Sequence, residues 1–438
     1  MKLDSRGYRL YWDEERETMD PRERDRVILA RIQHQLHYVY ESLPFYRRHY
    51  DAHGFKPGDV QSLEDFTEKV PVITKKMLVA DQREHPVFGS YAGDFAEDDV
   101  ARIQGSSGTS GHPTFYRVSR RDWDRCGDVA AMALWACGVR PDDIAQISFP
   151  FALFFGGWGV LQGVERLGAT AFPLGAIDSE RHLTLMPVIG STLFVGTPSY
   201  CNHLLSVAEG MGIDLAASTV RRLFVGGEPG GSLPGTRELL TRGWNASVHD
   251  SGSTSEMYPF NTNTAAVPED GVLLFQDEVY AEIVDRDDSN VQVPDGERGG
   301  IVYTHLWRES QPMIRFWSGD ETYKVYDGPA SCGRTYPRLP EGVVGRLDDM
   351  LVIRGANIYP SAVETVLRRF EAFGPEFQIV VDRKGALDEI RVRVELTEAF
   401  ARGAGDDARA DLAGRAGDQL KRDLQIRIPV ELLEPGTL

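Results

Sequence analysis

The sequence has few cysteines, no long apolar run and a deficit of positive charge. Its four cysteines, Cys126, Cys137, Cys201 and Cys332, have neither the spacing of a disulfide framework nor that of a paired zinc motif. The formal net charge of −18 disfavours binding to phosphate backbones and acidic membranes. No apolar run approaches the ~20 residues of a membrane span, and residues 1–9 contain no apolar stretch, so we expect no signal peptide. We expect a cytoplasmic protein with reduced thiols that binds neither nucleic acid nor membrane.

The 438 residues exceed what one ordinary hydrophobic core accommodates, so we expect two or three domains. Apolar spacing predicts an amphipathic helix that begins near Arg22 and ends near Pro44. From about residue 100 to 260, apolar strand-like runs alternate with helical patterns, which favours a parallel sheet covered by helices. The predicted strands are 144–149, 192–195 and 222–225, and the predicted helices are 123–137 and 200–211.

Residues 273–326 are rich in β-type patterns and predict a smaller β subdomain, with strands at 279–284, 300–304 and 321–325. After Gly345 the pattern changes to a compact α+β unit. Its predicted elements are a strand at 350–353, a helix at 361–370, strands at 378–381 and 389–395, a helix at 406–424 and an apolar segment at 428–433. The expected fold class is therefore α/β, with a large N-terminal domain (1–344) and, after a hinge, a small α+β domain (345–438).

Residues 104–114 place glycines and hydroxyl residues between two predicted strands, at 100–103 and 115–118. Glycine lets backbone N–H groups approach an anion closely, and hydroxyls add further donors. Taken alone, such a turn is more often a flexible hairpin loop. A Walker loop is disfavoured, because its Gly-Lys-Ser/Thr ending is absent. The candidate phosphate-binding residues are Ser106, Ser107, Gly108, Thr109, Ser110 and Gly111.

Further motifs follow in a fixed order along the chain. They are residues 154–159 (FFGGWG), 165–169 (ERLGA), 197–200 (TPSY), 226–229 (GGEP), 254–256 (TSE), 314–320 (IRFWSGD) and 345–360 (GRLDDMLVIRGANIYP). Together with the hydroxyl-rich loop they resemble the phenylacetate–CoA ligase branch of the adenylate-forming superfamily, over roughly residues 10 to 438. The resemblance implies ATP, Mg²⁺ and coenzyme A as cofactors, and a possible homodimer.

The resemblance also implies roles for individual residues. Ser255 and Glu256 would contact the α-phosphate and its Mg²⁺, since a hydroxyl and a carboxylate oxygen are suitable hard ligands for this ion. Asp320 would hold the ribose hydroxyls, Arg346 would reach ribose or phosphate, and Asp348 would be the pivot of the small domain. The remaining expected nucleotide or coenzyme A contacts are Gly227, Glu228, Pro229, Asp250, Thr254 and Gly355.

The chain departs from the family pattern in three places. His112 stands where a lysine is usual, Gly252 replaces the aromatic residue expected to stack on adenine, and Cys332 alone remains of a four-ligand zinc set. Losing a stacked ring weakens nucleotide binding by ~0.5–1.5 kcal/mol. One thiol does not make a structural zinc site, so we predict no zinc.

Residues 148–158 align with the stretch that lines the aryl-acid pocket in similar enzymes. Phenylalanines supply flat apolar walls, although two or three of the large aromatic residues here would equally suit an ordinary core. The expected contacts of an aromatic carboxylate are Phe149, Phe151, Phe155, Gly156, Thr197, Ser199 and Tyr200.

The family's last strand is usually followed by a segment whose lysine bridges the substrate carboxylate and the α-phosphate. Here the last lysine is Lys421 and the sequence ends at Leu438. A mobile cation of this kind is worth ~10³–10⁵ in rate by analogy with arginine fingers. Three explanations of the missing lysine are open: the sequence is shortened, another cation substitutes for the lysine, or the protein has been repurposed.

The leading hypothesis is a ligase that forms an aryl adenylate and transfers the acyl group to coenzyme A. The alternatives are transfer to an amine, hydroxyl or carrier-protein thiol, and a non-catalytic aryl-acid or nucleotide-binding homologue.

Overall fold

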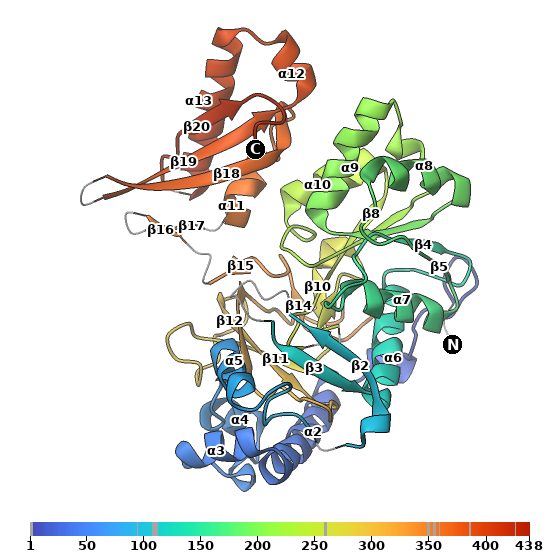
Figure 1. Ribbon diagram of the computed structural model, residues 1–438, viewed down its shortest axis with the longest axis vertical. Helices are drawn as coiled ribbons and strands as arrows, with labels where there is room; N and C mark the ends of the chain where they lie inside the picture. The colour runs from blue at the N-terminus through green and yellow to red at the C-terminus, as the bar shows by residue number, and fades with distance from the viewer. Residues whose placement is uncertain are drawn as a thin grey trace.

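The computed structural model describes residues 3–93, 95–106, 113–257, 261–347, 351–353, 356–358, 360–384, 387–424 and 426–438. They form a large N-terminal part and a small C-terminal part, which lies above it in Figure 1. Among these residues, every helix is too short or too polar to cross a bilayer.

The N-terminal segment is helical and covers one end of the β subdomain. Its helices are α1 (Glu14–Glu17), α2 (Pro21–Ser42), α3 (Pro44–Ala52), α4 (Leu63–Lys69) and α5 (Lys75–Glu84). The Asp20 carboxylate caps α2 by accepting hydrogen bonds from the N–H groups of Arg22 and Glu23. The predicted end near Pro44 is confirmed, because α2 ends at Ser42 and Pro44 begins α3.

An eight-stranded sheet forms the centre of the large part, in the order β14-β10-β9-β8-β7-β6-β4-β5. The strands β4 (Ile144–Ile147), β5 (Thr170–Pro173), β6 (Leu193–Gly196), β7 (Arg222–Val225) and β8 (Ser247–Gly252) pair in parallel. The antiparallel edge consists of β9 (Asn263–Thr264), β10 (Val272–Leu274) and β14 (Arg338–Leu339). The accompanying helices are α6 (Arg120–Ala136), α7 (Gly156–Leu167), α8 (Ser179–Ile189), α9 (Pro198–Met211) and α10 (Pro234–Trp244). The predicted α/β class with a parallel sheet is confirmed.

The β subdomain contains the five strands β1 (Ile73–Thr74), β13 (Phe316–Thr322), β12 (Gly299–His305), β11 (Val279–Val284) and β15 (Gly345–Arg346), the last pairing with β13. A separate hairpin joins β2 (Val100–Gly105) to β3 (Phe115–Ser119). The predicted strand 321–325 is wrong in position. The strand begins at Phe316, and after Thr322 the chain turns so that Val325 pairs with Arg338 instead.

The small C-terminal part has its own sheet, in the order β18-β19-β20, and its own hydrophobic core. Its elements are β16 (Leu351–Ile353), β17 (Ala356–Ile358), α11 (Pro360–Leu367), β18 (Phe373–Lys384), β19 (Leu387–Leu396), α12 (Glu398–Gly403), α13 (Asp406–Leu424) and β20 (Val430–Leu433). Val363, Val392, Leu412 and Ile428 are almost fully buried in this core. The predicted α+β unit is confirmed, and the predicted helix 406–424 has the observed bounds.

The two parts touch through α10 and α11. A Cβ on Gly235 would lie 2.9 Å from the Thr365 carbonyl oxygen, so the glycine lets the two backbones approach closely. Nearby, Arg242 Nη1 lies 3.3 Å from a Glu371 carboxylate oxygen in an exposed ion pair. Beside this contact, a groove of about 350 Å³ separates the two parts, and Glu228, Arg346, Glu364 and Arg368 are among its lining residues.

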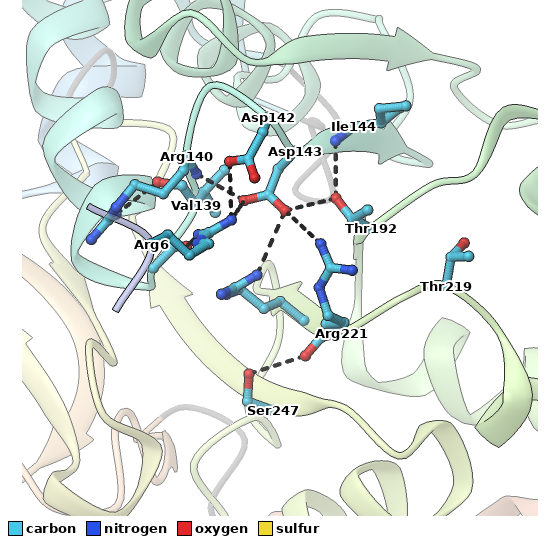
Figure 2. Close-up of polar contacts among 12 residues, drawn as sticks. Arg6, Val139, Arg140, Asp142, Asp143, Ile144, Thr192, Thr219, Arg221 and Ser247 are labelled. Carbon is cyan, nitrogen blue, oxygen red and sulfur yellow. Dashed lines mark hydrogen bonds and ion pairs between the residues drawn. The ribbon is translucent and has the colours of Figure 1, made fainter. Parts of the chain in front are cut away.

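A buried carboxylate ties the first residues of the chain to the parallel sheet (Figure 2). Asp143 accepts hydrogen bonds from Arg6 (3.1 Å), the Arg140 N–H (2.8 Å) and the Thr192 hydroxyl (2.8 Å), and Arg221 lies 3.4 Å away. Burial opposes ionisation of this group, but the hydrogen bonds and the arginines outweigh it, so the pKa of Asp143 is lowered. The ionised side chain therefore stabilises the fold at neutral pH.

Candidate active site

The carboxyl ends of the parallel strands meet at one edge of the sheet, where ligands of α/β proteins commonly bind. The loop 251–256 begins with the last two residues of β8 at this edge, and it lines two cavities. One cavity has a volume of about 430 Å³ and a largely apolar lining, and the other, of about 380 Å³, carries charged groups. Both are lined by Gly227 and by residues 251–255, so the two cavities are adjacent and share a wall.

Buried groups hold this loop from below. The Arg308 guanidinium donates a hydrogen bond to the Glu256 carbonyl oxygen (3.1 Å). His305 Nδ1 accepts from the Met313 N–H (3.0 Å), which leaves its Nε2–H to donate to the Met257 carbonyl oxygen (2.9 Å). Burial lowers the pKa of His305 well below its ordinary value, so the ring stays neutral. The loop is thus held by a fixed hydrogen-bond pattern.

The Glu256 carboxylate is buried and has a cationic partner that the sequence analysis missed. Lys75 Nζ lies 2.6 Å from Glu256 Oε1, and the Lys75 side chain remains 43% exposed. Lys75 is the first residue of α5, directly after β1, whose pairing with Phe316 and Trp317 of β13 carries it to the site. No local sequence pattern marks this lysine, because only the strand pairing brings it close to Glu256.

The base of the hydroxyl-rich loop connects to the same carboxylate. Ser106 Oγ accepts hydrogen bonds from the Thr114 N–H and hydroxyl, both at 3.0 Å. The Thr114 hydroxyl in turn lies 2.9 Å from the Tyr116 hydroxyl, which lies 3.5 Å from Glu256 Oε1. The Ser106 hydroxyl thus joins the two ends of the hydroxyl-rich loop by its hydrogen bonds with Thr114. Ser107, Gly108, Thr109, Ser110, Gly111 and His112 lie outside the described residues.

Asp320 and Arg346 face each other across the strands β13 and β15. Arg346 Nη1 lies 3.1 Å from Asp320 Oδ1, and both residues line the charged cavity together with Lys75 and Glu256. The structure therefore brings four of the predicted site residues, Asp320, Arg346, Ser255 and Glu256, into the lining of one cavity. Asp348 and Gly355 lie outside the described residues.

Asp250, within β8, also lines the charged cavity. Burial raises its pKa to about 6, although hydrogen bonds from Ser232 and Ser251 act in the opposite direction. Gly252, on the same strand, has a structural reason for its identity. A Cβ at this position would lie 2.8 Å from Asn263 Oδ1, so the Asn263 side chain fills the space next to the glycine.

Gly227, Glu228 and Pro229 also line the charged cavity. Gly227 has a φ of +88°, a conformation that favours glycine, and so permits the turn after β7. Glu228 Oε1 accepts a hydrogen bond from the Ser199 N–H (2.7 Å), which joins this turn to the start of α9.

The apolar cavity contains only some of the predicted acid-binding residues. Phe149, Phe155, Gly156 and Thr197 line it, and Phe154, Val160, Phe224 and Asn261 add to its wall. The other three predicted residues make contacts elsewhere. The Phe151 ring packs on Trp158, with ring centroids 5.0 Å apart. The Tyr200 ring lies near Phe194 and His182. Ser199 lines the groove between the two parts.

One polar atom in the loop supports a ligand at this position. Thr254 Oγ1 is buried and has no hydrogen-bond partner within the described part of the chain. Such an atom carries a desolvation cost unless a ligand or water satisfies it. Its hydroxyl, with that of Ser255 and the Glu256 carboxylate, forms a set of oxygen donors that suits Mg²⁺. Among the residues that the structure describes, no group of three or more His, Cys, Asp or Glu side chains is arranged to hold a metal.

Residues 355–438 match the AMP-binding enzyme C-terminal domain family. The chain is 33% identical to a phenylacetate–coenzyme A ligase of Thermus thermophilus, over 98% of this chain and 96% of the relative. The chain belongs to the phenylacetate–coenzyme A ligase family of adenylate-forming enzymes. A second relative, the phenylacetate–coenzyme A ligase of Escherichia coli, is 34% identical over 84% of this chain and 82% of its own length. The protein is thus an AMP-forming ligase that uses ATP and coenzyme A.

The arrangement of the two parts resembles one state of a solved ligase. Against 2-hydroxyisobutyryl-CoA ligase in the postadenylation state the TM-score is 0.93, at 40% identity over 100% of this chain and 91% of that chain. Against the same enzyme in the thioesterification state, at the same identity and coverage, the TM-score is 0.76. The ligase described here is therefore closer to the postadenylation arrangement.

Proposed function

We propose that this ligase activates an aromatic carboxylic acid as its acyl adenylate and transfers the acyl group to coenzyme A. The observation that carries the proposal is the shared wall of the two cavities. An apolar acid in the larger cavity would present its carboxylate to the loop 251–255, next to the charged groups that suit a nucleotide. Attack of the carboxylate on the α-phosphorus releases pyrophosphate, and attack of the coenzyme A thiol on the adenylate then releases AMP.

The charged cavity supplies groups for both ends of a nucleotide. Asp320 would accept hydrogen bonds from ribose hydroxyls, and Arg346, which lies 3.1 Å from it, would donate to ribose or phosphate oxygens. Glu256, with Thr254 and Ser255, would hold a magnesium ion, which would neutralise developing phosphate charge. Positioning and charge neutralisation are the main contributions that the protein makes to this chemistry.

Lys75 is our candidate for the cation that acts during adenylation. In the structure its ammonium pairs with Glu256 at 2.6 Å. If Glu256 held a magnesium ion, Lys75 would be available to pair with the acid carboxylate or with an α-phosphate oxygen. One explanation of the missing C-terminal lysine is that another cation substitutes for it, and Lys75 is our candidate for that cation.

The division into domains 1–344 and 345–438, with Asp348 as the pivot between two arrangements, is part of this proposal. The separate core of the small part supports it, as does the agreement with one of two states of the solved ligase. Such a two-state closure lets one site carry out two reactions in sequence.

A short 2-hydroxy acid is the second candidate substrate, because the relative at 40% identity is a 2-hydroxyisobutyryl-CoA ligase. The apolar wall of Phe149, Phe154, Phe155, Val160 and Phe224 favours an aromatic ring over a hydroxyl group. The cavity volume of about 430 Å³ also accommodates a substituted ring.

The test is pyrophosphate release by the purified protein with Mg·ATP and a panel of benzoates, arylacetates and short 2-hydroxy acids, each with and without coenzyme A. We expect release with an aromatic acid, and a coenzyme A thioester detected by mass spectrometry. Preference for the short hydroxy acids would favour the second candidate. Turnover without coenzyme A, to an added amine or hydroxyl acceptor, would contradict the proposed acceptor.

A further inference from the structure

The Phe155 ring lies directly on the backbone of the helix that it begins. Phe155 is the N-cap of α7, and its carbonyl oxygen accepts a hydrogen bond from the Gly159 N–H (2.9 Å). A Cβ built on Gly159 would lie 1.9 Å from Phe155 Cζ, 2.2 Å from Cε2 and 2.6 Å from Cε1. The ring thus occupies the volume that any side chain at position 159 would need.

This arrangement depends on the helix geometry. Residues four apart lie on the same face of a helix, so Phe155 and Gly159 are neighbours one turn apart. A methyl group at position 159 would displace the far end of the Phe155 side chain, while the nearest atoms that it meets are not backbone atoms. The expected response is a change of the Phe155 rotamer and not a loss of the helix.

The surroundings determine where a displaced ring can go. The Trp158 ring, next to Gly159 in the chain, is held by contacts of its own: it packs on Phe151 at 5.0 Å, lies 4.4 Å from the Arg102 guanidinium carbon, and its Nε1–H donates to the Ala152 carbonyl oxygen (3.0 Å). Gly156 and Val160 line the apolar cavity that Phe155 itself borders. The cavity is therefore open space that a displaced Phe155 ring can enter.

We infer that Gly159 is a specificity-determining position, because its missing side chain keeps the Phe155 ring flat on α7 and so sets the room for the acid. Gly159 does not line the cavity and acts only through Phe155. The inference rests on the proposed function, since it assigns the acid to this cavity. An alanine at 159 would move the ring into the cavity and exclude the larger acids while it leaves the nucleotide groups untouched.

The test compares wild type with Gly159→Ala over acids of increasing size, from isobutyrate through benzoate and phenylacetate to naphthylacetate. We expect the KM of the arylacetates to rise by about tenfold or more, comparable to one methylene misfit in a pocket. The kcat with small acids and the KM for ATP should stay within about twofold of wild type. Gly210→Ala is the matched control, because Gly210 also lies in a helix, α9, and a Cβ there meets nothing within 4 Å.

A second variant removes the ring. Phe155→Ala should allow the ligase to accept larger acids. Adding Gly159→Ala to Phe155→Ala should not change further how the KM depends on the size of the acid. An unchanged size profile in Gly159→Ala, or the same loss in the double variant as in Gly159→Ala, would overturn the inference. Circular dichroism and thermal unfolding confirm that each variant is folded.

Direct acid binding, measured by isothermal titration calorimetry, separates this inference from the proposed function. Acid binding without pyrophosphate release would refute the proposed function, and a size dependence of binding that shifts in Gly159→Ala would still support the inference. Acid binding that is equal in both proteins, or absent from both, would overturn it.

Discussion

Replacement of Lys75 by methionine tests the proposed role of its ammonium in adenylation. At about 4 Å and an effective dielectric of ~20, a lysine ammonium and a phosphate or carboxylate charge attract by ~4 kcal/mol. The Lys75 side chain is 43% exposed, so solvent screening reduces this attraction, and we take roughly half to three quarters of it, about 2–3 kcal/mol. Loss of that energy from the transition state corresponds to a decrease of about 30- to 150-fold in rate.

The assay measures the two half-reactions separately. Single-turnover release of pyrophosphate reports adenylation, and thioester formation from synthetic acyl adenylate and coenzyme A reports the second step. In Lys75→Met we expect adenylation to slow by the calculated factor and thioester formation to change by less than about threefold. Lys75→Arg, which keeps the charge, should recover part of the adenylation rate. Adenylation within threefold of wild type in Lys75→Met would refute the reasoning.

Glu256→Gln should lower acid-dependent pyrophosphate release by about 10²–10³-fold and raise the Mg²⁺ concentration needed for the half-maximal rate. An unchanged Mg²⁺ requirement would count against the proposed role of Glu256 as a metal ligand. Asp250 has a pKa raised from 3.8 to about 6, so the native state binds the proton more tightly and this group makes stability fall between about pH 4 and pH 6. The stability of wild type relative to Asp250→Asn should therefore decline by about 2–3 kcal/mol between pH 4 and pH 7 in urea unfolding, and a constant difference would contradict this. Asp143 has a lowered pKa, so its contribution is present above the ordinary value of 3.8 and is lost as the pH falls through the folded value. Asp143→Asn should lose about 2–4 kcal/mol of unfolding free energy at pH 7, with a smaller loss in acid, and equal losses at pH 7 and pH 3 would exclude the charge as the cause.

The parallel sheet was predictable because its strands are short apolar runs with helical patterns between them. Residues 222–225 are a strand as expected, and the helix 406–424 has its predicted bounds. The strand expected at 321–325 was misplaced because β propensity continues past Thr322, whereas the pairing with β12 begins at Phe316 and the chain then turns toward β14. The local sequence pattern does not show which strand a segment pairs with or where that pairing ends.

The ordered motifs identified Glu256, Asp320 and Arg346, and the structure shows that these three residues line one cavity. Lys75 was not visible, because the pairing of β1 with β13 joins segments that are far apart in the sequence. The acid-binding residues within the aromatic stretch 148–158 could be predicted only in part. Phe149 and Phe155 line the cavity, whereas Phe151 packs on Trp158. A run of aromatic residues in a sequence does not show which ring faces a cavity.

The contact between α10 and α11 has a thermodynamic consequence for the catalytic cycle. The small part meets the large one where Gly235 approaches Thr365 and where an exposed ion pair joins Arg242 to Glu371. An exposed pair contributes only ~0–1 kcal/mol, so this ion pair adds little to the preference for the arrangement. A bound ligand shifts the populations of two arrangements by its difference in affinity for them. Molecules bound in the site can therefore select the arrangement without first breaking a strong ion pair at this contact.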